Sequence, residues 1–244
     1  MNAVITAGAP LDGDFEKFAG VSFKALAPMR GRTLLDGTID ALRAVGIERI
    51  AVVGGDDVAR SCAQRVTRIV PDAGSGAGNV LAALDAWNDD GAPLLYLTCD
   101  MPYIDARSLR DFLGRVPRDT LAMPLTEHAA FVQRFPDAPA AGITLAGERV
   151  VNGGVFLIPA YASPRIRSFA TQLFDARKAP WRMARITGPL LLLRFTFGRL
   201  SIAQLEQRAK DVLGMNVLAV RNAAPELAYD VDVADEYRYA VEHA

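Results

Sequence analysis

The sequence predicts a three-layer α/β sandwich, in which helices cover both faces of a mostly parallel central sheet. Short apolar runs rich in Val and Ile alternate with segments of helical period over the first hundred residues. These runs lack the polar alternation of strands that face water on one side, so both faces of the sheet are expected to be buried. The chain has 244 residues, 51% of them hydrophobic, which is ample for one α/β core.

The first half is expected to alternate strands and helices. A buried strand at Ala3–Thr6 is followed by a long Gly-rich loop that extends to Ala27. Apolar residues then recur at helical spacing over Arg32–Val45, and Gly46 ends this helix. The other expected elements of this half are the strands Arg49–Val53, Val66–Val70 and Pro93–Cys99 and the helices Asn79–Trp87 and Ala106–Leu113.

The second half is less regular. A loop-rich insertion is expected over Glu127–Glu148, and two or three helices across Pro164–Leu213. The expected strands are Thr120–Leu125, Val150–Pro159 with its Gly pair, and Asn216–Arg221, and the last helix is Val233–His243. Since no repeat or linker interrupts the chain, residues 1–244 are interpreted as one domain with a helical subdomain inserted at about 160–214.

Charge and cysteine content argue against several classes of protein. The net charge is −1, whereas nucleic-acid-binding proteins usually carry a basic excess. Cys62 and Cys99 lie far apart without CxxC spacing, which suits neither a disulfide framework nor a zinc site. The N-terminus lacks a basic signal-peptide region, and no apolar run approaches the ~20 residues of a membrane span. A soluble cytoplasmic protein is expected.

Two phosphate-binding motifs can be tested directly. The sequence contains no GxxxxGK[ST] motif. The stretch Gly74-Ser-Gly-Ala-Gly-Asn79 resembles GxGxxG but has Asn79 at the last glycine position. A dinucleotide-dependent oxidoreductase is therefore a weak interpretation.

The stretch LLYLTCDMPYID places Asp100 directly after a buried strand. Ligands of parallel sheets bind beyond the carboxyl ends of the strands, and Mg²⁺ takes one or two protein carboxylates together with substrate phosphates. Asp100 suits that role. The alternative is that Asp100 caps the next helix, but Asp105 is better placed as the cap.

Two further constellations carry charge. Asp230 and Asp232 share one face of an extended segment, and two carboxylates on one face favour a cation between them. Alternatively, Asp232 caps the last helix and Asp230 is solvated. Lys24 lies among apolar residues at the end of the Gly-rich loop, where it can bind a phosphate as a point charge. The alternative is that Lys24, like Arg30 and Arg32 nearby, is an ordinary solvated charge.

Five stretches occur in the order seen in one family: VITAGA, FKALAPMRGRTLLDGTIDAL, LTCDMP, NGGVFLIP and YDVDVADEYRYA. The chain thereby resembles the nucleotidyltransferases of the GT-A-like (nucleotide-diphospho-sugar transferase) fold. Within these it is similar to the MobA-like NTP transferases, related to molybdenum-cofactor guanylyltransferase and to cytidylyltransferases. The resemblance extends from Ala3 to Glu242.

The resemblance implies an Mg²⁺-dependent enzyme that couples a nucleoside triphosphate to a phosphorylated acceptor and releases pyrophosphate. It implies that Lys24 neutralises the triphosphate and that Asp100 holds Mg²⁺, with Asp232, or alternatively Asp230, as the second carboxylate. Residues implied to line the nucleotide are Ala7, Gly8, Ala9, Gly76, Gly78 and Asn79, and those implied to border the acceptor are Asn152 and Gly153.

Two segments depart from that family. The first loop lacks the usual arginine and carries Asp12, Asp14 and Glu16, which in an extended loop share one face. This degenerate loop favours the alternative of a non-catalytic nucleotide-binding or regulatory module. A glycosyltransferase of the same fold is the other alternative, which a DxD motif in mid-chain would favour, but Asp100-Met-Pro does not match that motif. Segment 188–213 has no counterpart in that family. It is interpreted either as an exposed amphipathic face for a homodimer or a lipid surface, or as subdomain core, and its length favours the core interpretation.

Overall fold

The computed structural model describes residues 1–244 except 89, 140–141, 177–185 and 187. Within the described residues, nine strands form one sheet in the order β5-β4-β1-β6-β10-β7-β9-β8, and β11 pairs with the other edge of β7. The strand pairings show that β9 and β10 are antiparallel to the other seven strands. The strands are β1 (Asn2–Thr6), β4 (Ile50–Gly54), β5 (Arg68–Pro71), β6 (Leu94–Thr98), β7 (Thr120–Glu127), β8 (Ile143–Leu145), β9 (Glu148–Asn152), β10 (Val155–Ile158) and β11 (Asn216–Arg221).

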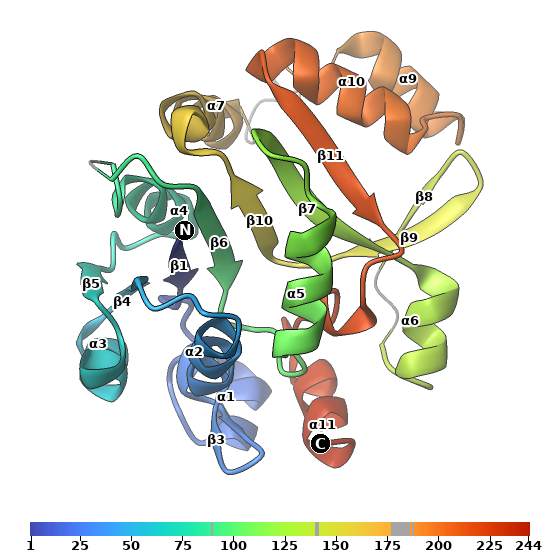
Figure 1. Ribbon diagram of the computed structural model, residues 1–244. Helices are drawn as coiled ribbons and strands as arrows, with labels where there is room; N and C mark the ends of the chain where they lie inside the picture. The colour runs from blue at the N-terminus through green and yellow to red at the C-terminus, as the bar shows by residue number, and fades with distance from the viewer. Residues whose placement is uncertain (89, 140–141, 177–185, 187) are drawn as a thin grey trace.

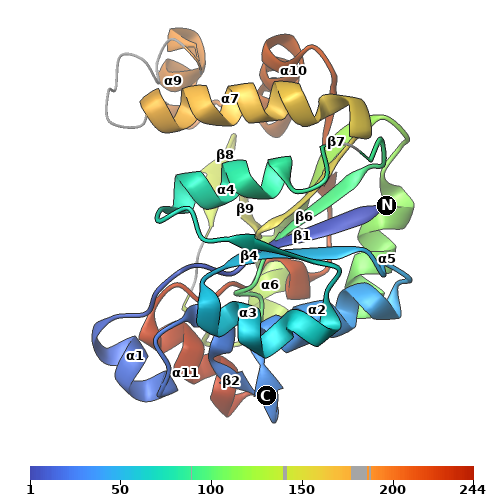
Figure 2. The same cartoon turned by 90° about the vertical axis from the view of Figure 1, so that its left-hand side faces the viewer.

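Helices cover both faces of this sheet, as the sequence predicts (Figures 1 and 2). On one face lie α2 (Leu34–Ala44), α3 (Asp56–Cys62) and α5 (Ala106–Arg115). The other carries α4 (Gly76–Asp85), then an outer group of α7 (Ser163–Ala176), α9 (Pro189–Thr196) and α10 (Ile202–Leu213). The remaining elements are α1 (Gly13–Ala19), α6 (His128–Arg134), α11 (Ala234–Glu242), the hairpin β2 (Pro28–Met29)–β3 (Arg32–Thr33) and short 3₁₀ turns at Lys24–Leu26, Ala63–Arg65, Ala160–Ala162 and Pro225–Leu227.

Local sequence signals explain several helix boundaries. The hydroxyl of Thr33 accepts from the Asp36 N–H, and the Asp36 carboxylate accepts from the Thr33 N–H, so a capping box begins α2. Asp105 likewise accepts from the Ser108 N–H at 2.7 Å and begins α5. The prediction that Asp105 is the cap is confirmed, and Asp100 does not cap this helix.

Two loop predictions are wrong. The expected loop from Thr6 to Ala27 contains α1, because Leu11, Phe15 and Ala19 recur every fourth residue and are all buried. The expected insertion Glu127–Glu148 holds α6 and β8, although residues 140–141 lie outside the described part.

The expected strand Val150–Pro159 is two strands, β9 and β10, separated by Gly153 and Gly154. On β7, Leu125 pairs with Asn152 of β9, and Ala122 pairs with Leu157 of β10. An advance of three residues along β7 therefore corresponds to five residues along its partner. Two extra residues form a bulge at the glycine pair. A Cβ on Gly153 would overlap the carbonyl oxygen of Leu227, and one on Gly154 would overlap the Thr98 hydroxyl.

We expect Gly153→Ala to destabilise the fold by about 2–4 kcal/mol, because backbone lies where the methyl group would be. Gly114→Ala, within α5 and with open space around the added carbon, is the matched control and should be neutral or slightly stabilising. Urea denaturation of both variants measures the difference. Equal stability of the two variants would show that the bulge accommodates the added methyl group without loss of stability.

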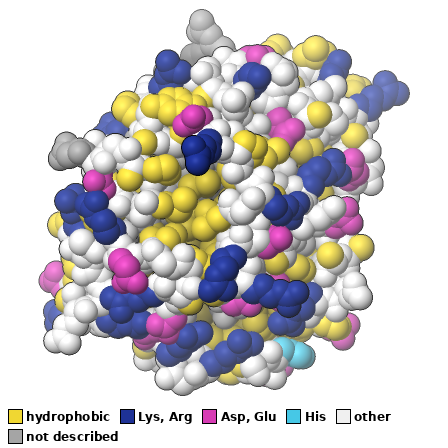
Figure 3. Space-filling model, in the orientation of Figure 1, with side chains coloured by type: hydrophobic (Ala, Val, Ile, Leu, Met, Phe, Trp, Pro, Cys, Tyr) yellow, Lys and Arg dark blue, Asp and Glu magenta, His cyan; other side chains and the backbone are white. Residues whose placement is uncertain are grey.

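The helical insertion combines core and surface. Leu191, Leu200, Ile202 and Leu205 pack in one hydrophobic cluster, whereas Leu192 and Phe195 are exposed. The interpretation of the segment as subdomain core is therefore correct for α10 and wrong for most of α9; residues 177–185 and 187 lie outside the described part. No helix in the described residues is long and apolar enough to cross a membrane. On the face in Figure 3, basic and acidic side chains are intermixed.

Candidate active site

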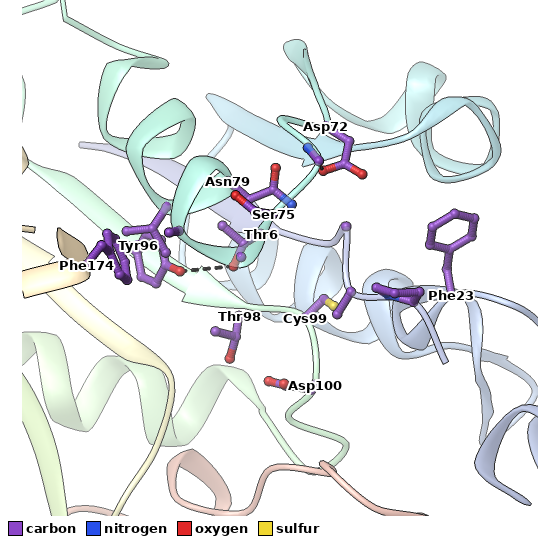
Figure 4. Close-up of a pocket in the computed structure, with 17 residues that line it drawn as sticks. Thr6, Phe23, Asp72, Ser75, Asn79, Tyr96, Thr98, Cys99, Asp100 and Phe174 are labelled. Atoms are coloured by element: carbon purple, nitrogen blue, oxygen red, sulfur yellow. Dashed lines mark hydrogen bonds between the residues drawn. The ribbon is translucent and has the colours of Figure 1, made fainter. Parts of the chain in front are cut away.

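The carboxyl ends of the parallel strands β1, β4, β5 and β6 meet at one edge of the sheet, where ligands of such sheets bind. A pocket of about 670 Å³ opens there. Figure 4 shows Asn79 and Ser75 on one side of it, Thr98 and Asp100 on the other, and Phe23 and Phe174 toward its two ends.

One wall of the pocket is the turn that leads into α4. The Asn79 side chain is buried, and its amide oxygen accepts from the Ala73 N–H at 2.8 Å. The Ser75 hydroxyl caps α4 by accepting from the Gly78 N–H. Gly76 lines the pocket at this helix start, where backbone N–H groups and the helix dipole favour an anion.

The adjoining wall is the loop after β1, whose Gly8 and Ala9 line the pocket. A Cβ on Gly8 would lie 2.5 Å from the Asn79 amide nitrogen, so only glycine lets the two walls approach this closely. Ala7 is buried in the core behind the pocket. Of the six residues expected along a nucleotide, Gly8, Ala9, Gly76 and Asn79 line the pocket, while Ala7 and Gly78 support it.

Lys24 forms the electrostatic centre of the site. Its ammonium donates to Asp232 at 2.7 Å and to Asp100 at 3.2 Å, although the residue is only 8% exposed. Burial opposes the charged form, but the two carboxylates outweigh it and raise the pKa of Lys24 above its ordinary value. Residues 24, 100 and 232 are thus brought together from three distant parts of the chain.

Lys24 does not use all of the hydrogen-bonding and ion-pairing capacity of these carboxylates. Oδ1 of Asp100 is buried with no hydrogen-bond partner within the described structure. Burial raises the pKa of Asp230 to about 7, and the negative charges of Asp100 and Asp232 add to this shift. Lys24 compensates this group of three carboxylates only in part, and a further cation would relieve the remaining repulsion.

An aromatic cluster holds residues 230–232, which we call the acidic segment, in place. Tyr229 packs against the rings of Tyr103, Phe131, Phe135 and Tyr239. The Val231 N–H donates to the carbonyl of Asp100 at 3.0 Å.

The same segment leads directly into α11. The Glu236 carboxylate accepts from the backbone N–H groups of Asp232 and Val233, so it is this side chain that satisfies the start of the helix. The alternative that Asp232 caps the helix is therefore wrong, and its carboxylate faces Lys24 instead.

No set of three or more His, Cys, Asp or Glu side chains is arranged around a possible metal position in the residues that are described. Mg²⁺ requires fewer protein ligands than such a set provides, since one or two carboxylates suffice when substrate phosphates complete its coordination shell. Asp100 and Asp232, both within hydrogen-bond distance of one ammonium group, fit this requirement.

Asn152 and Gly153 lie away from the pocket lining. Asn152 is exposed, and Gly153 packs against the backbone of Leu227, three residues before the acidic segment. The sequence interpretation also missed several lining residues. Tyr96 and Thr98 were findable, because they alternate along β6 on the same face as Asp100. Asp72, Ser75 and Phe174 gave no such periodic signal.

The acidic first loop does not have the expected conformation. Asp14 and Glu16 belong to α1, so residues two apart point in different directions rather than to one face. Glu16 accepts from the Ser22 hydroxyl at 2.9 Å. Asp12 and Asp14 line a second hollow, which Lys24 and Asp232 share.

A family model for the MobA-like NTP transferase domain matches residues 16–219. A comparison with curated proteins found no match. Among solved structures, a hypothetical transferase from Thermus thermophilus is 28% identical with a TM-score of 0.82, covering 96% of this chain and 99% of that chain.

Two more distant structures show the same fold. CTP:phosphocholine cytidylyltransferase from Streptococcus pneumoniae is 15% identical with a TM-score of 0.56, covering 99% of this chain and 98% of the other. 2-C-methyl-D-erythritol 4-phosphate cytidylyltransferase, also from Thermus thermophilus, is 16% identical with a TM-score of 0.56, covering 100% and 98%. With a family model over most of its length, a mostly parallel sheet and a pocket at the strand ends, the chain belongs to the MobA-like NTP transferase family and is a nucleotidyltransferase.

Proposed function

We propose that this protein is an Mg²⁺-dependent nucleotidyltransferase that couples a nucleoside triphosphate to a phosphorylated acceptor with release of pyrophosphate. The observation that carries the proposal is the buried Lys24 between Asp100, which lines the pocket, and Asp232. Lys24 and Asp232 line the adjoining second hollow, which shares Ala9 and Pro10 with the pocket. Two of the similar structures are named for acceptors that carry a phosphate, phosphocholine and 2-C-methyl-D-erythritol 4-phosphate. Both names support this acceptor class.

In the proposed reaction, an oxygen of the acceptor's phosphate attacks the α-phosphorus. The bond from that phosphorus to the oxygen bridging to the β-phosphorus breaks, and pyrophosphate leaves. Asp100 and Asp232 would hold Mg²⁺, which supplies charge neutralisation at the phosphates. Lys24, released from one carboxylate, neutralises the triphosphate, while Gly8, Ala9 and the start of α4 line its path. No covalent intermediate is required, since positioning and charge carry the reaction. The roles of Asn152 and Gly153 at the acceptor stay predictions.

A pyrophosphate-release assay tests this function. The four nucleoside triphosphates are combined with a panel of phosphorylated alcohols and sugars, each with Mg²⁺ or with a chelator. Pyrophosphate is expected only when nucleotide, acceptor and Mg²⁺ are all present. Release of orthophosphate, or tight binding of nucleotide-sugars without turnover of any triphosphate, would contradict the proposal.

The acidic hollow beside Lys24 gives a further prediction. Replacing Asp12 and Asp14 with Asn should tighten triphosphate binding, because each carboxylate near a phosphate opposes it by roughly 1 kcal/mol in water-like surroundings. Glu16→Gln is the matched control, since Glu16 is bonded to Ser22 and lies outside the hollow. Isothermal titration with and without Mg²⁺ measures the effect. Weaker binding by the double variant would mean that these carboxylates hold a cation or a cationic acceptor.

A further inference from the structure

Helix α9 exposes large apolar side chains around most of its circumference. Leu190, Leu193, Phe195 and Phe197, at its end, are between 49% and 69% exposed, while Leu191 packs inward against the insertion's hydrophobic cluster. A helix that is apolar on nearly all sides belongs in a core or in lipid rather than in water. Some partner is therefore expected to cover this surface, which we call the α9 face.

The charge around this face identifies the kind of partner. Residues 188–205, which include α9, contain Arg194 and Arg199 and no Asp or Glu, in a chain whose net charge is −1. These two cations line a hollow of about 320 Å³ together with Leu193 and Phe197. Cations beside exposed Leu and Phe side chains suit anionic headgroups with acyl chains beneath them.

A second copy of the chain fits the same surface poorly. A two-fold contact places a surface against itself, so the cationic α9 face would meet another cationic face with no acid in the stretch to compensate it. Spanning a bilayer is also excluded for α9, because its eight residues extend only about 12 Å. Figures 1 and 2 both place α9 at the periphery of the molecule, where a flat surface can reach it.

We propose that the α9 face docks the protein on an anionic lipid surface. Leu190, Leu193 and Phe197 would enter the headgroup region, and Arg194 and Arg199 would pair with lipid phosphates. This inference rests on the insertion alone, and it stands or falls independently of the nucleotide chemistry at Asp100.

Co-sedimentation with vesicles tests the proposal. Wild type is expected to bind vesicles of phosphatidylcholine mixed with phosphatidylglycerol, to bind pure phosphatidylcholine more weakly, and to be released by salt. Leu193→Asp combined with Phe197→Asp should reduce partition to the mixed vesicles by at least about tenfold. Arg194→Gln combined with Arg199→Gln should abolish the preference for the anionic lipid.

The control is Val132→Asp with Val241→Asp, which introduces the same two charges at exposed apolar residues on α6 and α11 and should bind like wild type. Thermal unfolding and pyrophosphate release verify that each variant is folded. Absence of wild-type binding to the mixed vesicles would overturn the proposal. So would a dimer in analytical ultracentrifugation that the Leu193 and Phe197 changes dissociate, since the face would then be a contact between copies.

Discussion

Asp100→Ala is expected to abolish Mg²⁺-dependent nucleotide binding and to reduce turnover by roughly a thousandfold or more, about 4 kcal/mol of transition-state stabilisation. The Asp100 side chain is only 15% exposed, against 68% for Asp232, and its Oδ1 has no hydrogen-bond partner in the described residues. Isothermal titration with and without Mg²⁺, followed by pyrophosphate release, measures both effects.

The fold should survive this change, because Lys24 keeps its shorter bond to Asp232. Asp105→Asn is the matched control: it removes a nearby carboxylate but retains an oxygen that caps α5, so activity and stability should change little. An unfolded Asp100→Ala protein would assign Asp100 a structural role. Nucleotide binding as tight as in wild type with Mg²⁺ would rule out its metal role.

Lys24→Met is expected to lower kcat/KM for the triphosphate by about 10²–10³, the usual loss when one charged donor to a transition state is removed. Affinity for the nucleoside without phosphates should be nearly unchanged, because a point charge acts on the phosphates. Methionine retains an apolar stem of similar length, so packing around η1, the turn Lys24–Leu26, is preserved.

Lys17→Met serves as the control, since Lys17 is 80% exposed and pairs only with Asp14 among the described residues. The Lys24 variant should also lose some stability, because Asp100 and Asp232 would face each other without a cation. Added Mg²⁺ should restore that stability if the two carboxylates hold the ion. Equal losses of affinity for nucleoside and triphosphate would instead make Lys24 a structural residue.

The sequence by itself determined the elements with strong local signals. Short apolar runs predicted β1, β4 and β6, and the β-branched run Val66–Val70 predicted β5. The strand Asn216–Arg221 was predicted with its observed bounds. Asp105 followed by a helical period predicted the start of α5. In each case the information lies within a few neighbouring residues. Ordered family motifs then pointed to Lys24, Asp100 and Asp232 before their proximity was known.

Only the tertiary structure decided how these residues combine. Residues 24, 100 and 232 meet because three chain segments end at one edge of the sheet, and no local pattern encodes the hydrogen bonds between them. The bulge at Gly153 depends on the backbone of Leu227, more than seventy residues away. The exposure of α9 likewise depends on which faces its neighbours cover. Periodicity reports what a segment prefers, whereas burial, pairing and pKa are properties of contacts between distant segments.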